Sequence, residues 1–224
     1  SNDTDTHKMR ELGFRSDYLQ TGYDEKHYWN GEVERQKKIV FIGNNYSHDS
    51  FQQGKLRFDM VSRLKQEFAD NFVVFGNNWQ MVGNIKPTES KDFERGLYNH
   101  YLIAINIPHI NCAKYYSDRQ LRAMACGAMV ISQNYPDFEH EFKIGEHLEV
   151  WQDIEDLVKK CRYYLNNTSK AIEIGKRASD FVKEKCTIAG VALAIQICNY
   201  LDPQLEVNFS CKDGDIIEDV PACT

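Results

Sequence analysis

Short apolar runs and longer amphipathic stretches alternate along most of the chain. The apolar runs have the length and composition of strands, and they are residues 37–42, 71–75, 101–107, 128–131 and 148–151. Several stretches between and after them repeat apolar residues at helical spacing, which predicts helices over residues 56–68, 91–99, 153–165, 169–185 and 188–201. This alternation predicts an α/β fold, in which a doubly wound, Rossmann-like parallel sheet is flanked by helices and followed by C-terminal helices.

The segment of residues 115–132 combines a loop, a helix, a glycine turn and a buried strand. Ser117 or Asp118 is the expected N-cap, whose side-chain oxygen accepts a hydrogen bond from a first-turn amide. Gly127 supplies the backbone freedom that ends the helix. Free amides, the positive end of the helix dipole and the guanidinium of Arg119 meet at the helix start, which is an arrangement suited to phosphate. The alternative is an ordinary capped helix with a surface arginine.

A second candidate region follows the first strand, which runs into the polar turn of Gly43 and Asn44. The carboxyl edge of a parallel sheet is where open α/β folds bind ligands, and Gly43 lets the backbone approach a phosphate closely. Arg57 lies near the start of the next helix and outside its expected apolar stripe. It either reaches a phosphate or is solvated. The expected stripe is Phe58, Val61, Leu64 and Phe68.

Other loop residues have both a binding and a structural interpretation. Asn77 and Trp79 follow the second strand, where Trp79 either stacks on a base or sugar ring or packs in the core. His109 either touches phosphates or is exposed. Glu139 either accepts hydrogen bonds from sugar hydroxyls or belongs to a solvated face.

The composition indicates a globular protein and excludes several classes. The 224 residues are 42% hydrophobic and include 12 Tyr, 12 Phe and 3 Trp, which is not the composition of a disordered chain. A formal net charge of −6 argues against a general nucleic-acid binder, which usually carries a basic stripe. Neither GxGxxG nor GxxxxGK[ST] follows the first strand, so an NAD-type site or a P-loop is not expected.

The cysteines are scattered and lack zinc-ligand spacing, so no metal site is expected. They are Cys112, Cys126, Cys161, Cys186, Cys198, Cys211 and Cys223. Cys126, Cys161 and Cys198 fall at apolar helical positions and are expected to be buried thiols, which favours a reducing, cytoplasmic location. No apolar run approaches the roughly 20 residues of a membrane span, and no signal-peptide core opens the sequence.

Several motifs, taken in order, resemble the C-terminal, nucleotide-sugar-binding half of GT-B glycosyltransferases, in the spore-maturation-protein-like branch of the group 1 families. The resembling pieces cover about residues 18–200. They are YLQTGYDEKHYW (18–29), IVFIGNNY (39–46), the helix around Arg57 to Phe68, VVFGNNW (73–79), YYSDRQLRAMACGAMVIS (115–132), the segment 136–167 and KRASDFVKEKCT (176–187). The resemblance implies one half of a GT-B fold, with residues 1–36 as N-terminal segment and interdomain linker, residues 37–202 as donor-binding domain and residues 203–224 as tail.

The resemblance also implies an activity, namely transfer of a sugar, of hexosyl type, from a nucleotide diphosphate sugar to an unknown acceptor. Family members stabilise the leaving diphosphate with helix N-termini and basic side chains, without a metal or another cofactor. The implied phosphate site consists of Gly43, Asn44, Arg57, Ser117 and Arg119. A further N-terminal domain is expected to bring the acceptor and any general base, so that this chain by itself is either inactive or half of an enzyme.

The chain departs from the family pattern on the helix within the segment of residues 115–132. Many relatives carry a glutamate there that is expected to hold the donor ribose, whereas this chain has Arg122. Lys114, eight positions earlier, is also not the glutamate of the two-glutamate motif. Arg122 therefore joins Asn77, Trp79 and Glu139 as a possible donor contact. The departure favours an alternative function, a non-catalytic nucleotide-sugar-binding or interaction domain derived from a glycosyltransferase.

Overall fold

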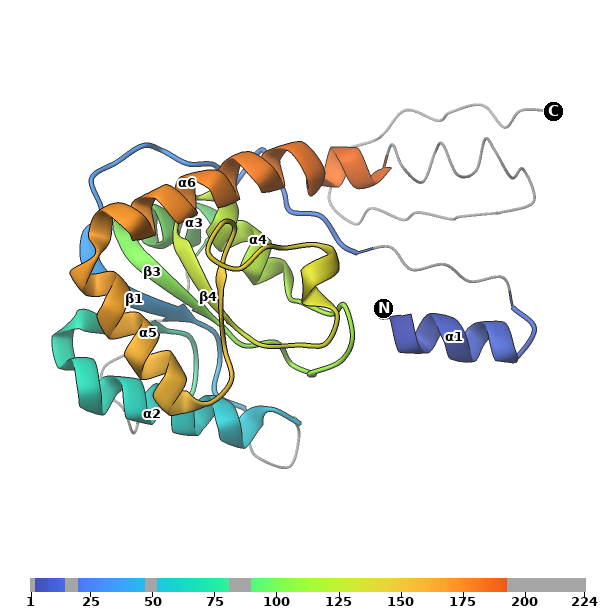
Figure 1. Cartoon of the computed structure of the whole chain (residues 1–224), viewed down its shortest axis with the longest axis horizontal. Coiled ribbons are helices and arrows are strands. Elements are labelled where there is room, and N and C mark those ends of the chain that lie inside the picture. Colours follow the sequence, from blue (N-terminus) through green and yellow to red (C-terminus); the bar gives the residue numbers. More distant parts are fainter. Residues whose placement is uncertain (1–2, 15–19, 47–51, 81–89, 193–224) are drawn as a thin grey trace. The chain divides into compact units, whose positions relative to one another are not determined.

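The computed structural model of the chain describes residues 3–14, 20–46, 52–80 and 90–192. Its centre is a five-stranded sheet in the order β2-β1-β3-β4-β5, in which every neighbouring pair is parallel (Figure 1). The strands are β1 (Gln36–Ile42), β2 (Phe72–Phe75), β3 (Tyr101–Asn106), β4 (Met129–Gln133) and β5 (Glu149–Trp151). The predicted Rossmann-like fold is confirmed, and each strand lies within two residues of its predicted bounds.

The strands are almost continuously apolar because the sheet is covered on both faces. Every residue of β4 is buried, and in β3 only Tyr101 is partly exposed. Val40, Ala104 and Val130 lie side by side across the three central strands. Successive strand residues point to opposite faces of the sheet, so Val40, Ala104 and Val130 belong to one hydrophobic cluster and their chain neighbours to a second cluster on the other face.

The two faces carry different helices (Figure 1). On one face, α2 (Gly54–Phe68) and α5 (Ile154–Asn166) pack over the sheet through residues such as Met60 and Leu157. On the other face, α3 (Lys91–His100) and α4 (Asp118–Ala125) do so through Leu97 and Leu121. The long helix α6 (Thr168–Lys185) supplies residues to both clusters. The remaining elements are α1 (Asp3–Glu11) and the short 3₁₀ turns η1 (Ala69–Asn71) and η3 (Phe138–His140).

Two predicted helix boundaries are confirmed by their local contacts. The Asp153 side chain accepts the amide of Asp156 at 2.8 Å and so caps α5. Gly127 has φ of +75°, and a Cβ there would lie 2.6 Å from the side-chain nitrogen of Asn30. Gly127 is therefore a structural turn that also needs to lack a side chain.

The buried stripe of α2 differs from its prediction. Met60, Val61 and Leu64 are fully buried, whereas Phe58 is only half-buried. Arg57 precedes Met60 and Val61 by three and four positions, lies on the same stripe and is 1% exposed. The interpretation of Arg57 as lying outside the stripe was wrong, and the solvated alternative is excluded.

The C-terminal predictions are tested only in part. The chain is helical over residues 188–192, where the described residues end, so most of the predicted helix 188–201, Cys198 and the tail 203–224 lie outside them. Cys126 and Cys161 are buried free thiols as predicted. In the part of the chain that the structure describes, no helix combines the length and apolar character needed to cross a membrane.

Candidate active site at the centre of the sheet edge

The chain leaves the neighbouring strands β1 and β3 in opposite directions. β1 leads through α2 to β2 on one side, whereas β3 leads through α4 to β4 on the other. Connections that diverge in this way open a crevice at the carboxyl ends of the central strands, where proteins of this strand order bind ligands. Gly43 and Asn44 follow β1 at this edge, and His109 lies three residues beyond β3.

Arg57 bridges the two strand ends from its position in α2. Its Nη1 donates to the backbone oxygen of Asn44 at 3.1 Å, and its Nη2 donates to that of Ile107 at 3.4 Å. The guanidinium carbon lies 5.4 Å from the centre of the Tyr46 ring, and Nε is buried without a hydrogen-bond partner. Arg57 is therefore a buried cation that touches both sides of the crevice and keeps an unused donor.

Arg119, the second residue of α4, reaches the same crevice. Its Nη1 donates to the backbone oxygen of Ile42 at 3.1 Å, and its Nη2 lies 3.4 Å from Nε2 of His109. A Cβ on Gly43 would lie only 2.6 Å from Nη1. The absence of a side chain at Gly43 thus makes room for Arg119 as well as for close approach of the backbone.

The two arginines at this edge, Arg57 and Arg119, carry positive charges that no nearby carboxylate of the described residues balances. Burial, and then the charge of Arg119, lower the pKa of Arg57 to about 10. Burial and the two arginines lower the pKa of His109 to about 4, so His109 is neutral at pH 7. Among the described residues, no carboxylate oxygen lies within ion-pair distance of Arg57 or Arg119. An anion in the crevice would supply the missing negative charge and would favour the charged form of Arg57.

The loops after β1 and β2 hold each other in place beside the arginines. The side-chain oxygen of Asn44 accepts the amide of Asn77 at 2.8 Å. Trp79 donates from Nε1 to the backbone oxygen of Gly43 at 2.7 Å and packs edge-on against Phe41. Trp79 is 2% exposed, so its ring belongs to the core and offers no face on which a base or sugar could stack. Asn77 is exposed at the predicted edge.

Ser117 has the predicted N-cap position but not the predicted hydrogen bond. Its side chain makes no capping bond and instead donates to Oδ1 of Asn106 at 3.0 Å. Asn106 in turn donates to Gln120 and Ser132, and this buried polar group fixes α4 on the ends of β3 and β4. Ser117 is 6% exposed and its hydroxyl is already bonded to Asn106, so the side chain is not placed to contact a phosphate.

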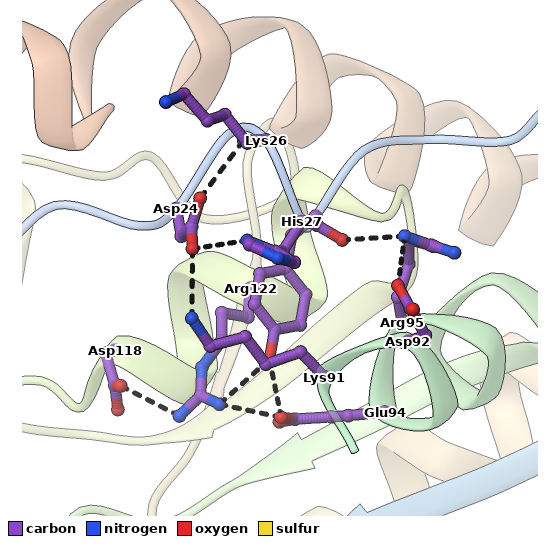
Figure 2. A network of polar contacts seen from close by, with 10 residues as sticks. Asp24, Lys26, His27, Lys91, Asp92, Glu94, Arg95, Asp118 and Arg122 are labelled. Atoms are coloured by element: carbon purple, nitrogen blue, oxygen red, sulfur yellow. Dashed lines mark hydrogen bonds and ion pairs between the residues drawn. The ribbon is translucent and has the colours of Figure 1, made fainter. Parts of the chain in front are cut away.

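Arg122 is held away from the crevice by carboxylates of its own chain. Figure 2 shows it between Glu94 of α3, at 2.7 Å, and Asp118, at 2.8 Å. Glu139 is exposed on η3 and stays a predicted contact. The edge thus brings together Gly43, Asn44, Arg57 and Arg119, while Arg122 lies in a separate network.

The sequence interpretation missed Gln120, which is fully buried and whose Nε2 has no hydrogen-bond partner. A glutamine in the first turn of an amphipathic helix gives no signal of burial, because Asn106 and Ser132, which donate hydrogen bonds to its Oε1, come from other elements. Across the described ranges, His, Cys, Asp and Glu side chains form no group of three or more that could hold a metal ion.

Fold and site together define a Rossmann-like domain with a cationic crevice at its topological switch point. The chain belongs to the glycosyl transferase-like family, whose model matches residues 57–196. That range includes Arg57, Arg119 and four of the five strands. No curated protein matches the chain.

Solved structures with the same fold are GT-B group 1 glycosyltransferases or parts of them. Sucrose-phosphate synthase from Thermosynechococcus elongatus has 14% identity and a TM-score of 0.60, with 92% of this chain and 58% of that chain covered. HepE from Anabaena, in complex with UDP-glucose, has 12% identity and a TM-score of 0.64, with 90% and 62% covered. The C-terminal domain of the group 1 protein LpcC from Francisella tularensis has 12% identity and a TM-score of 0.56, with 75% and 100% covered.

These likenesses confirm the predicted half of a GT-B fold. The chain spans 58% and 62% of the two longer proteins, but the full length of the isolated C-terminal domain is covered.

Proposed function

We propose that this chain is the donor-binding half of a glycosyltransferase and holds the diphosphate of a nucleotide diphosphate sugar on Arg119, with the buried charge of Arg57 beside it. The observation that carries the proposal is the pair of guanidiniums at the β1–β3 switch point, fixed on backbone carbonyls and lacking carboxylate partners within the described residues. A protein rarely buries a cation without a counter-charge unless a ligand supplies one.

The proposed chemistry is electrostatic. When the glycosidic bond breaks, negative charge develops on the leaving diphosphate, and fixed cations stabilise it without having to reorganise. Arg57 is already oriented by two backbone oxygens, and Arg119 by one. The amide of Asn44 and the amides at the start of α4 supply further donors for phosphate oxygens. The Gly43 amide is already used, since it donates to the backbone oxygen of Phe75 at 2.8 Å. No metal or other cofactor enters this proposal.

The nucleotide-sugar part of the proposal is supported by what a structural neighbour binds. HepE was solved in complex with UDP-glucose and with UDP, and its fold covers 90% of this chain. Since the chain covers 62% of HepE, we assign acceptor binding and any general base to another domain. The base, the sugar and the acceptor are left to experiment.

The test is a thermal-shift screen of the 224-residue chain with UDP, GDP, ADP and UDP-glucose, because a ligand that binds the native state raises the melting temperature. One nucleoside diphosphate is expected to stabilise the protein, and Arg119→Ala is expected to remove most of that effect. Arg177→Ala is the matched control, since Arg177 is a half-exposed arginine on α6 that pairs with Glu173. Equal shifts in wild type and Arg119→Ala, or no shift at millimolar ligand, would contradict the proposal.

One observation favours the alternative of a non-catalytic nucleotide-sugar binder. Arg122 replaces the glutamate of many relatives, and its contacts are internal. An assay of sugar release separates the two functions, with the nucleotide sugar that binds best as the substrate. Turnover supports the transferase, whereas tight binding without hydrolysis or transfer, also when an acceptor domain is added, supports the alternative.

A further inference from the structure

The two arginines of α4 have opposite surroundings although they are only three residues apart. Arg119 points to the crevice and has no carboxylate partner among the described residues, whereas Arg122 has two. Nη1 of Arg122 donates to Glu94 and Nη2 donates to Asp118, as Figure 2 shows. The charge of Arg122 is therefore neutralised within the protein, while that of Arg119 remains available to a ligand.

The Asp118 carboxylate is close enough in the chain to compete with a ligand for Arg119. Asp118 is the first residue of α4 and directly precedes Arg119, and its side chain is 52% exposed. Its charge is felt at His109, which lies 3.4 Å from Arg119. A mobile carboxylate at this point would have two effects, since it would pair with Arg119 and repel a phosphate.

Arg122 is well fixed for the task of holding Asp118. Glu94 lies on α3, has a side chain 9% exposed and accepts hydrogen bonds from both Arg122 and Tyr28, the latter at 2.8 Å. The guanidinium also lies 5.4 Å from the centre of the Tyr28 ring, and Tyr28 is 2% exposed. With one end of its fork anchored on Glu94, the other end holds Asp118 at a defined place.

The segment that carries Tyr28 is itself fastened to α3. Asp24 accepts hydrogen bonds from His27 and from Lys91, and Arg95 donates to the backbone oxygen of His27 (Figure 2). Three parts of the chain therefore meet at Arg122, namely the segment before β1, α3 and the first turn of α4. Their contacts hold the Arg122 side chain in place near the start of α4, the helix that also carries Arg119.

We propose that Arg122 is a positioning residue, which keeps the Asp118 carboxylate away from Arg119 and so leaves the crevice open to a diphosphate. This inference rests on the proposed function. In this inference Arg122 does not contact the ligand. Asp118 weakens diphosphate binding only when Arg122 is lost.

The test is calorimetric titration of UDP into the full chain and its variants, at a temperature where circular dichroism shows each to be folded. Arg122→Gln is expected to lower the affinity about tenfold, within the range of coupling between neighbouring charged residues. Adding Asp118→Asn to Arg122→Gln is expected to restore the affinity to within about threefold of wild type. Asp118→Asn alone is expected to leave it unchanged or slightly higher.

The rescue separates positioning from a merely structural role, because loss of stability in Arg122→Gln would not be repaired by removing a second ion-pair partner. Arg95→Gln is the control, since Arg95 also joins α3 to the segment before β1 but, among the described residues, bonds through its guanidinium to Asp92 and His27 and not to Asp118. If Arg122→Gln does not fold, Arg122→Lys, which can hold only one carboxylate, is expected to lose a smaller factor and to be rescued in the same way.

Three results would overturn the inference: an unchanged affinity of folded Arg122→Gln, a loss that Asp118→Asn fails to repair, or a loss caused by Asp118→Asn alone. In each of these, wild-type binding and its dependence on Arg119 leave the proposed function standing. If the wild type binds none of UDP, GDP, ADP and inorganic pyrophosphate, the proposed function and this inference are refuted together.

Discussion

Replacing Arg57 by methionine tests whether a binding-site cation is kept at the expense of stability. Arg57 is 1% exposed and has no carboxylate partner among the described residues. Methionine is unbranched and flexible, and it fills irregular spaces in a core without a charge. The substitution should therefore stabilise the fold while it removes one of the two cations of the crevice.

The size of the effect follows from two opposing contributions. One pKa unit corresponds to about 1.4 kcal/mol, and the pKa of Arg57 falls to about 10, so the buried charge costs about 3 kcal/mol. The hydrogen bonds to Asn44 and Ile107 are 3.1 and 3.4 Å long and offset about 1 kcal/mol each. The expected net gain is about 1 kcal/mol, or about 2–4 °C in melting temperature for a chain of this size.

The sign does not depend on pH in the usual working range. The folded-state pKa of Arg57 lies below the unfolded one, so the destabilisation is fully present below about pH 10 and disappears only as pH rises through the folded pKa. The gain in Arg57→Met should accordingly be the same at pH 6 and pH 8. Equal gains at both values agree with this sign, whereas a gain that differs between them would contradict it.

The assay is urea unfolding followed by circular dichroism, with and without UDP. Arg63→Met is the matched control on the same helix, because Arg63 pairs with Glu67 and Glu155 near the surface. The control should lose little stability, because its ion pairs are near the surface, and should keep its response to UDP. Arg57→Met should gain stability and lose the response. A melting temperature several degrees below wild type in folded Arg57→Met would refute the reasoning.

Three other predictions concern single residues of the fold and site. Gly43→Ala would place Cβ 2.6 Å from Nη1 of Arg119, so calorimetry should find UDP affinity about tenfold lower and stability reduced by only about 1 kcal/mol. Gly175→Ala would meet a backbone oxygen at 2.2 Å and should cost about 3 kcal/mol or more, whereas Gly96→Ala meets open space in α3 and should gain up to about 1 kcal/mol by denaturant unfolding. His109 has a folded pKa of about 4, below its unfolded value, so wild-type stability should fall between about pH 6.5 and pH 4, and a flatter curve is expected for His109→Gln.

The fold could be predicted because its determinants are local or repeat along the chain. β3 is apolar at every position except Asn106, and β4 begins with the apolar run Met129–Ile131, as a sheet covered on both faces requires. Asp153 caps α5 with a bond that spans three residues, so its sequence context contains the whole interaction. The order of the strands was not predicted, because right-handed crossovers are compatible with more than one order of five parallel strands.

The contacts of the site could be predicted only as far as the backbone determines them. Gly43 and Asn44 were placed correctly because a strand end and a glycine turn fix their edge of the sheet. The Ser117 hydroxyl was assigned to a local cap, but it bonds Asn106, which lies on another strand. A local hydrogen bond and a tertiary one compete for the same oxygen, and the sequence shows only the first.

Charged residues are where local patterns mislead most, and Arg57 and Arg122 show why. Arg57 occupies a core position of α2, yet any hydrophobic pattern scores an arginine as exposed. Arg119 and Arg122 are equivalent in a helical pattern, but Glu94, 28 positions before Arg122, neutralises one and leaves the other for a ligand. Breaks in the pattern of this kind are expected where function and stability conflict. The buried, unpaired Arg57 is such a break, which is why its removal, rather than its retention, should stabilise the fold.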